Sequence, residues 1–195
     1  MERSSPEVGA EQGTNALVFW PVFVCVLLAD VVTKAIAEYA LGSYEPPRPV
    51  LGNGLRFVLV YNPGAAFGLH LGPYSRWIFM VLTGGALFVL WRLYQQTTAG
   101  DRQRTMALAL VCAGALGNLA DRIRSPRGVV DFIDVGFGET RWPTFNIADI
   151  AVSSGAFLLA WVLWGEDQRA AAAAAAAAQQ SESTDPAPVR SREAS

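Results

Sequence analysis

The side chains best suited to chemistry in this sequence are aspartates beside long apolar stretches. Asp30, Asp121 and Asp149 lie at the ends of uncharged stretches, and Asp131 lies within the segment Val129–Val135. Two carboxyl groups that are held close together and partly removed from water can share one proton, because their repulsion raises the pKa of one of them. The ionised partner can then take a proton from water while the protonated partner polarises a carbonyl group. Such a pair would catalyse hydrolysis.

Other kinds of catalytic site have little support. His70 is the only histidine and lies in a Gly-rich segment without a nucleophile motif, which disfavours a Ser-His-Asp or Cys-His arrangement. Cys25 and Cys112 stand alone within apolar stretches, so neither a disulfide framework nor a zinc site is indicated. A metal site built from three acids has no recognisable ligand spacing; these acids are Asp131, Asp134 and Asp149. We therefore expect no cofactor and no metal.

One apolar stretch places polar residues on the face of a predicted helix. Asn118 and Asp121 share that face with Gly114 and Gly117, and small residues of this kind let helices approach closely. The structural alternative is a packing face with an interfacial anchor formed by Asp121 and Arg122.

The last apolar stretch also begins with polar residues on one face. Asn146, Asp149 and Ser153 share a face at helical spacing. Asn146 can instead cap the helix, which is a common role of asparagine. Asp149 can be a first-turn acid that the helix dipole favours. Both interpretations remain open for each residue taken alone.

The connections between the apolar stretches contain two predicted strands. Leu55–Tyr61 is followed by a turn at Asn62-Pro63-Gly64. In Val129–Val135, alternate residues face opposite ways, which places Asp131 among apolar neighbours. The structural alternative for Asp131 is a solvated acid near a turn. Asp134 fits that description better, because a glycine follows closely.

Four long uncharged stretches must position these residues. They predict membrane spans at about 16–36, 76–95, 105–123 and 147–165. The first stretch has no basic segment before it and no clear cleavage site after it, so we interpret it as a retained span. Residues 1–15 are predicted to be a disordered cytoplasmic N-terminus. Residues 166–195 are predicted to be an Ala-rich cytoplasmic tail that is disordered or partly helical.

Basic residues predict the orientation in the membrane. Arg92, Arg102 and Arg104 flank the short second connection, which favours a cytoplasmic position for it and for both termini. The polar residues at the span ends then share the opposite face of the membrane. Aspartate side chains are too short to reach water easily from a span end, so they are candidates for a function. Asp30 and Lys34 are four residues apart, and a stabilising ion pair is the preferred interpretation there.

The composition excludes one class of partner. The formal net charge is −2, with 15 Lys and Arg against 17 Asp and Glu, so the sequence has no basic character that would indicate a nucleic-acid partner. The hydrophobic fraction of 52% is concentrated in the four stretches, which indicates a small integral membrane protein.

Five motifs together resemble the lipoprotein signal peptidase family, also called signal peptidase II. Each is weak alone, but their order and their positions at the ends of four spans are specific, and the resemblance covers roughly residues 16–165. The motifs are Asp30-x-x-Thr33-Lys34, Asn62-x-Gly64-Ala65-Ala66-Phe67, Gly117-Asn118-x-x-Asp121-Arg122, Val129-Val130-Asp131-Phe132 and Phe145-Asn146-x-Ala148-Asp149.

The resemblance implies a mainly α integral membrane protein with four transmembrane helices and a small extracytoplasmic β-cradle. It implies an aspartic endopeptidase of the bacterial inner membrane that cleaves prolipoproteins before their diacylglyceryl-modified cysteine. The partners would be these prolipoproteins and membrane lipid, and we expect a monomer. A small non-enzymatic transporter or scaffold is the alternative, although the middles of the spans offer few polar groups for a pathway.

The resemblance also implies a role for each matching residue. Asp131 and Asp149 would be the catalytic pair. Substrate binding would involve Asn62, Gly64, Asn118, Arg122 and Asn146. Support for the site would come from Asp30, Lys34 and Asp121.

Overall fold

The computed structural model describes residues 7–42, 46–64 and 72–184. The chain divides after Leu159 into two compact units. The first unit contains all of the strands and most of the helical residues. The second unit, in its described part, is the end of the last helix.

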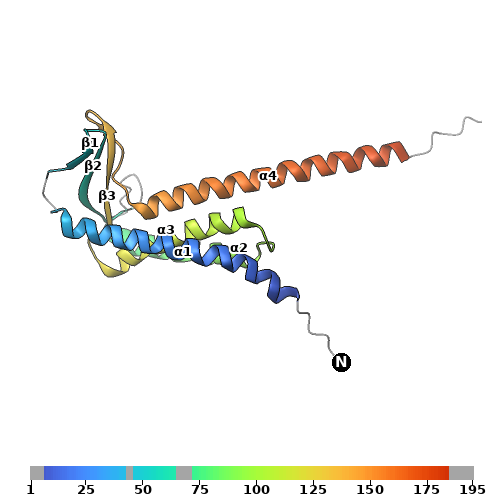
Figure 1. Ribbon diagram of the computed structural model, residues 1–195, viewed down its shortest axis with the longest axis horizontal. Helices are drawn as coiled ribbons and strands as arrows, with labels where there is room; N and C mark the ends of the chain where they lie inside the picture. Colours follow the sequence, from blue (N-terminus) through green and yellow to red (C-terminus); the bar gives the residue numbers. More distant parts are fainter. Residues whose placement is uncertain (1–6, 43–45, 65–71, 185–195) are drawn as a thin grey trace, which may run out of the picture. The chain divides into compact units, whose positions relative to one another are not determined.

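Among the residues that the structure describes, four helices are long and apolar enough to cross a membrane. Figure 1 labels them in chain order, and a short 3₁₀ helix, η2 (Gly72–Tyr74), precedes the second of them. The predicted fold class, mainly helical with four candidate membrane spans, is thereby confirmed. The four helices are α1 (Glu7–Ala40), α2 (Ser75–Gln95), α3 (Arg102–Arg124) and α4 (Ile147–Thr184).

Two helices continue beyond the predicted spans. Helix α1 begins at Glu7, within the segment predicted to be a disordered terminus. Helix α4 continues through the run Ala170–Ala178 to Thr184. Alanine is the best helix former, and each residue added to an existing helix gains a hydrogen bond without a new nucleation cost. A helix that begins in a membrane can therefore extend into a polar segment.

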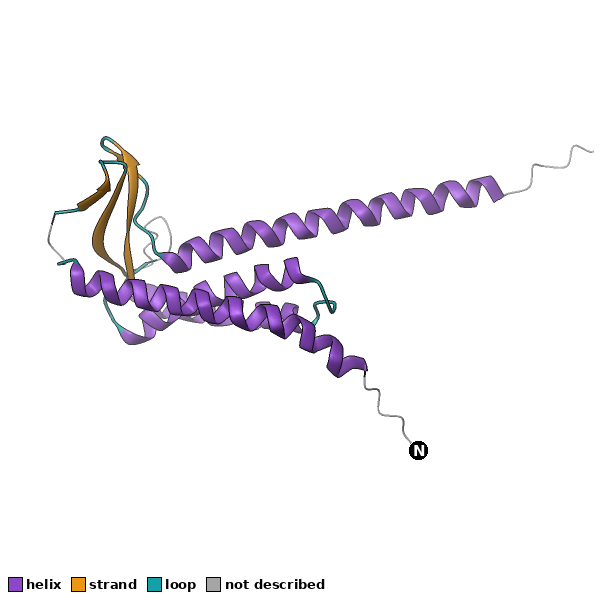
Figure 2. Cartoon of the chain, viewed as in Figure 1, coloured by secondary structure: helices purple, strands orange, loops and turns teal. Residues whose placement is uncertain are grey.

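Within the described ranges, four antiparallel strands form one small sheet, drawn in orange in Figure 2. The strands predicted at Leu55–Tyr61 and Val129–Val135 are confirmed and slightly longer. In the pairing of β2 with β3, Asn62 lies opposite Val129 and Val60 lies opposite Asp131. The strands follow the order β1 (Arg48–Leu51), β2 (Leu55–Asn62), β3 (Val129–Phe137) and β4 (Thr140–Arg141).

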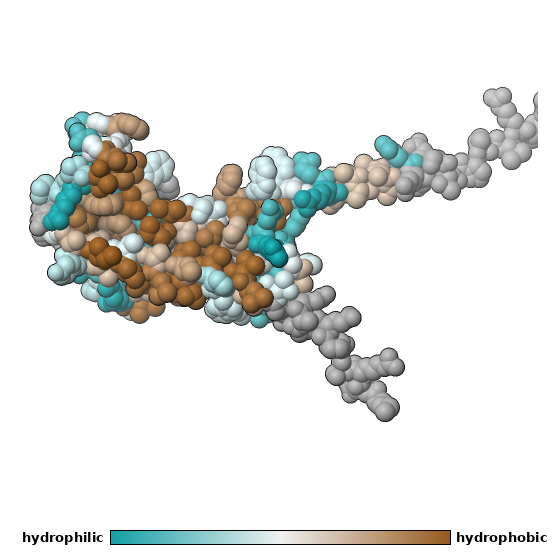
Figure 3. Space-filling view, viewed as in Figure 1, coloured by the Kyte–Doolittle hydropathy of each residue, from teal (hydrophilic) through white to brown (hydrophobic). Residues whose placement is uncertain are grey.

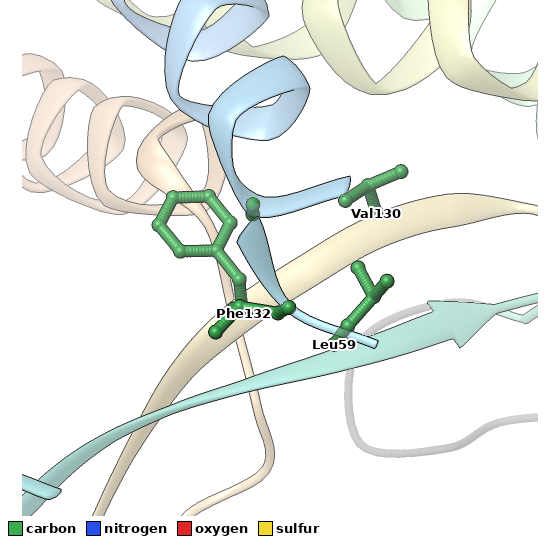
Figure 4. Close-up of a cluster of buried hydrophobic side chains, with 5 residues drawn as sticks. Leu59, Val130 and Phe132 are labelled. Carbon is green, nitrogen blue, oxygen red and sulfur yellow. The ribbon is translucent and has the colours of Figure 1, made fainter. Parts of the chain in front are cut away.

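A buried apolar cluster joins the end of α1 to the sheet. It contains Ala37 and Leu41 of α1 together with Leu59, Val130 and Phe132 of the strands, and Figure 4 shows the three strand residues beside one another. Val130 and Phe132 extend from the same face of β3, as alternation along a strand requires. This cluster places β3 against the helix that carries Asp30 and Lys34.

Close contact between helices depends on glycines. A Cβ atom at Gly114 of α3 would overlap the carbonyl oxygen of Ala148, and one at Gly155 of α4 would lie 2.8 Å from the carbonyl oxygen of Ala107. Helices α3 and α4 therefore pack with their backbones unusually close. The small-residue face predicted at Gly114 and Gly117 is confirmed.

The outer surface of the helices is apolar. Brown residues cover much of the visible helical surface in Figure 3. Helix α2 is an example, because Val81, Leu82 and Phe88 are each at least 60% exposed. Continuous apolar surface of this size is unfavourable in water and is typical of contact with lipid.

Candidate active site

Asn146 and Asp149 form reciprocal hydrogen bonds at the beginning of α4. The Asn146 Oδ1 atom accepts from the Asp149 amide at 2.9 Å, and the Asp149 Oδ2 atom accepts from the Asn146 amide at 3.2 Å. This is a capping box, which satisfies two backbone donors that a helix start leaves free. The structural interpretations of both residues are thus correct. The cap also holds the Asp149 carboxyl in a defined place.

Two amide side chains connect Asp149 to Asp131. The Asn146 Nδ2 atom donates to the Asp131 Oδ1 atom at 2.7 Å and to the Asn118 Oδ1 atom at 3.1 Å. The Asn118 Nδ2 atom donates to the Asp149 Oδ1 atom at 2.8 Å. Carboxyl groups from β3 and α4 therefore belong to one hydrogen-bonded network, with Asn146 fully buried at its centre.

Asp131 is the more buried member of the pair. Only 2% of its surface is exposed, whereas Asp149 is partly exposed. The Asp131 Oδ2 atom accepts from the Asn62 Nδ2 atom at 3.0 Å. Burial raises the pKa of Asp131 to about 7. The hydrogen bonds from Asn62 and Asn146 oppose this change, and the nearby charge of Asp149 adds to it. Asp131 can therefore gain and lose a proton near neutral pH.

The turn after β2 holds Asn62 in position. The Asn62 Oδ1 atom accepts from the Gly64 amide at 3.0 Å, which fixes the side chain against its own turn. Gly128 has a φ of +99°, and a Cβ atom there would overlap the Asn62 carbonyl group. The chain entering β3 thus lies directly against Asn62, and only glycine fits both the conformation and the space.

Lys34 is the centre of a buried charge cluster. Its Nζ atom lies 2.8 Å from Asp30, 2.9 Å from Asp121 and 3.0 Å from the Asn118 Oδ1 atom. The predicted ion pair between Asp30 and Lys34 is confirmed, and Asp121 joins it from α3. Three acceptors match the three donors of an ammonium group.

The two aspartates of this cluster also bind backbone amides near the catalytic candidates. The Asp30 Oδ1 atom accepts from the amide of Ala148 at 2.9 Å, and the Asp121 Oδ2 atom accepts from the amide of Val130 at 3.2 Å. These amides immediately precede Asp149 and Asp131 in the chain. The cluster therefore positions both candidates through the backbone.

Arg122 forms its hydrogen bonds with backbone carbonyl groups. Its Nη1 atom donates to the Asn118 carbonyl oxygen at 3.0 Å, and its Nη2 atom donates to the Gly64 carbonyl oxygen at 2.7 Å. The guanidinium group lies 5.7 Å from the centre of the Phe79 ring. Its Nε atom is buried and has no hydrogen-bond partner among the described residues.

Asp134 corrects an expectation, because it is not a solvated acid. Only 5% of its surface is exposed, and it forms salt bridges of 2.6 Å with Arg56 and 2.9 Å with Arg141. The strand register places Arg56 opposite Asp134, and the short hairpin after β3 returns Arg141 to the same point. Within the described ranges, no three His, Cys, Asp or Glu side chains are placed to hold a metal ion.

A cavity of about 880 Å³ lies against the carboxyl pair. Five of the predicted site residues line it, and the other five lie behind its wall in the hydrogen-bond networks described above. Most residues of the apolar wall are not predicted from the sequence. The predicted lining residues are Asn62, Asn118, Arg122, Asp131 and Asp149, and the missed ones include Tyr61, Phe79 and the four residues 142–145.

Four membrane-spanning helices, a small sheet and a pair of hydrogen-bonded carboxyl groups define a multi-pass membrane protein with an acidic site. Residues 22–165 match the family model described as Signal peptidase (SPase) II. The chain belongs to the signal peptidase II family, and it is therefore a peptidase of the membrane.

Individual relatives agree with this assignment. The chain is 37% identical over 157 residues to the lipoprotein signal peptidase of Polynucleobacter necessarius, covering 78% of this chain and 90% of the relative. It is 40% identical over 147 residues to that of Desulforapulum autotrophicum, covering 73% and 89%. A bacterial membrane enzyme solved by the in meso method at 2.3 Å resolution superposes with a TM-score of 0.69 at 31% identity, covering 80% of this chain and 91% of that one.

Proposed function

We propose that this protein is a membrane-embedded aspartic endopeptidase that cleaves prolipoproteins immediately before their diacylglyceryl-modified cysteine. The observation that carries the proposal is that Asp131 and Asp149, which are 18 residues apart on different elements, line one cavity and share a network of two amides. The names of the relatives, which are lipoprotein signal peptidases, support the class of substrate.

The environments of the two carboxyl groups suggest different roles. Asp131 is buried and has a pKa raised to about 7, so it is the general acid that protonates the scissile carbonyl oxygen. Asp149 is partly exposed to the cavity and accepts two N–H donors, so it is the general base that takes a proton from water. The water oxygen then bonds to the carbonyl carbon. In the resulting diol, Asp149 gives its proton to the amide nitrogen and Asp131 takes a proton from one of the two hydroxyl groups. The C–N bond then breaks, which releases an amine and a carboxylic acid.

The remaining site residues bind substrate or hold the pair. Arg122 and Asn62 face the cavity and have donors near the place where a peptide would lie. Gly64 offers backbone beside them, while Asn118 and Asn146 are engaged in orienting the carboxyl groups. Lys34, with its two aspartates Asp30 and Asp121, stabilises the arrangement from behind.

The position of the site suits a lipidated substrate. The candidate residues on helices lie toward the ends of α1 and α3 and at the beginning of α4. Because successive spans cross the membrane in opposite directions, these helix ends lie at the same membrane face. We infer that this face is extracytoplasmic, with both termini in the cytoplasm, because three arginines flank the connection between α2 and α3. A substrate anchored by acyl chains then meets the site without leaving the bilayer.

The proposal also assigns the parts of the chain. Residues 16–165 would be the peptidase domain, which contains the whole family match at 22–165. Residues 1–15 and 166–195 would be cytoplasmic extensions without a catalytic role. We propose that the enzyme acts as a monomer, because every residue of the proposed mechanism comes from one chain.

Cleavage of a lipidated substrate in the presence of a chelator tests the proposal. The purified full-length protein in detergent is incubated with a diacylglyceryl-modified prolipoprotein or with its unlipidated counterpart, with EDTA in excess. We expect cleavage of the lipidated form alone, directly before its cysteine. Cleavage that EDTA abolishes would indicate a metal enzyme, and absence of cleavage by folded protein would reject the peptidase assignment.

A further inference from the structure

An ionic cluster in the sheet, formed by the buried Asp134 and the partly exposed Arg56 and Arg141, takes no part in the proposed chemistry. The Asp134 Oδ2 atom accepts from the Nε and Nη2 atoms of Arg56 at 2.9 and 2.6 Å. The Asp134 Oδ1 atom accepts from the Nε atom of Arg141 at 2.9 Å. Arg141 also donates from Nη2 to the Asp134 carbonyl oxygen at 3.0 Å and from Nη1 to the Asn53 carbonyl oxygen at 2.6 Å. One side chain thus binds β3 and the turn between β1 and β2.

The cluster fixes one conformation of this part of the sheet and contributes little to the free energy of unfolding. Buried ion pairs recover little more than their desolvation cost, so they are better suited to defining geometry. Burial alone would raise the pKa of Asp134, but the hydrogen bonds from Arg141 and Arg56 outweigh it and hold that pKa below its usual value. A Cβ atom at Gly136 would overlap the backbone of Thr140, so the hairpin closes tightly enough for Arg141 to reach Asp134.

The segment Trp142–Phe145, which we call the strap, follows Arg141 directly and lines the cavity. Backbone hydrogen bonds hold both of its ends on β3. The Trp142 amide donates to the Val135 carbonyl oxygen at 2.8 Å, and the Phe145 amide donates to the Ile133 carbonyl oxygen at 3.0 Å. The next residue after the strap is Asn146, which caps α4.

We propose that Arg56, Asp134 and Arg141 are positioning residues that hold the strap as a rigid wall of the cavity. This wall limits the size of the substrate side chain immediately before the scissile bond. The inference rests on the proposed function. Signal peptides carry small residues at their cleavage sites, so a fixed wall matches the substrate class. Pro143 contributes to the rigidity because its ring fixes φ.

Among the three positioning residues, Arg141 is the one that lies directly before the strap in the chain. Its planar fork reaches three separate acceptors on two elements. A lysine at this position keeps the charge but offers a single ammonium group, which cannot reach all three in the same geometry. Arg141→Lys should therefore release the strap while leaving Asp131 and Asp149 in place.

The test compares two lipidated prolipoproteins that differ only in having alanine or leucine directly before the cysteine. We expect the unaltered protein to prefer the alanine substrate in kcat/KM, and Arg141→Lys to reduce that preference about tenfold, since a size difference in a pocket is worth roughly 10–200-fold. Arg48→Lys, a substitution of an exposed arginine in the same sheet, is the matched control and should leave the preference unchanged.

Other outcomes would overturn the inference. Equal losses for both substrates in Arg141→Lys would show that the cluster only stabilises the sheet. If Arg141→Lys does not fold, Pro143→Gly loosens the strap directly, and an unchanged preference in that variant would likewise reject the wall. Failure of the unaltered protein to cleave either substrate would contradict the proposed function itself, and this inference with it.

Discussion

Replacing Asp131 with asparagine removes a buried titrating group while preserving the size of its side chain. In the folded protein the pKa of Asp131 is raised to about 7, compared with an ordinary value of 3.8. A carboxyl group with a raised pKa contributes stability that is fully present below the unfolded pKa and is lost as the pH rises through the folded pKa. The free energy of unfolding of the unaltered protein should therefore fall between about pH 4 and pH 8. Asp131→Asn should lack this pH-dependent fall, because it has no carboxyl group to titrate at this position.

The size of the effect follows from the difference between the two pKa values. This difference of about three in pKa corresponds to about 4 kcal/mol in total, of which about 3 kcal/mol falls between pH 5 and pH 8. Asparagine has an NH2 group in place of one carboxyl oxygen, so Asn62 or Asn146 loses its acceptor. This loss lowers the free energy of unfolding by about 1–3 kcal/mol. This cost does not change with pH. The free energy of unfolding of the variant, relative to the unaltered protein, should thus improve by about 3 kcal/mol from pH 5 to pH 8.

Thermal unfolding in detergent measures this change through the fluorescence of the six tryptophans. A relative gain of this size should shift the difference in Tm by about 5–10 °C in favour of Asp131→Asn at the higher pH. Glu139→Gln, which alters an exposed acid in the turn between β3 and β4, is the control and should follow the unaltered protein at both pH values. A difference in Tm that stays constant between pH 5 and pH 8 would refute the raised pKa.

Three further results are expected. Gly114→Ala should lower the Tm markedly, because its Cβ atom would overlap the Ala148 backbone, whereas Gly84→Ala, with open space around it, should be tolerated; equal Tm values would contradict the close helix contact. Lys34→Met should cost about 3–5 kcal/mol, because two buried carboxylates lose their cation; a Tm within a degree of the unaltered protein would count against the charge cluster. Peptidase kcat/KM should fall about tenfold per pH unit above about pH 7, as Asp131 loses its proton; a rate that continues to rise to pH 9 would exclude Asp131 as the acid.

Local patterns are sufficient to predict two of the contacts around the candidate site. The pair of Asp30 and Lys34 follows from helical spacing alone, and it exists at 2.8 Å. The capping role of Asn146 follows from its position before an apolar stretch. In both cases the partners lie within four residues, so no knowledge of the tertiary fold is required.

Contacts that depend on strand register were beyond the sequence analysis. Asp134 was expected to be solvated because a glycine follows it closely, yet the register brings Arg56 opposite it. A shift of one residue would move the arginine to the other face of the sheet. No local signal fixes that register, so the ionic cluster could not be predicted.

The cavity wall illustrates the same limit over a longer range. Tyr61 and Phe79 meet at the cavity although they come from β2 and α2. Their types are ordinary for a membrane protein, and nothing in their spacing distinguishes them from lipid-facing residues. Polar residues inside apolar stretches are costly and therefore informative, whereas apolar residues there are not.

The most direct test of the account is cleavage of a diacylglyceryl-modified prolipoprotein by Asp131→Asn and Asp149→Asn in parallel. Both variants should insert and fold, with gel-filtration profiles like that of the unaltered protein, and both should fail to release the signal peptide. Glu139→Gln should cleave at the normal rate. Normal cleavage by either aspartate variant would contradict the central claim that the two carboxyl groups act together on water and the scissile carbonyl.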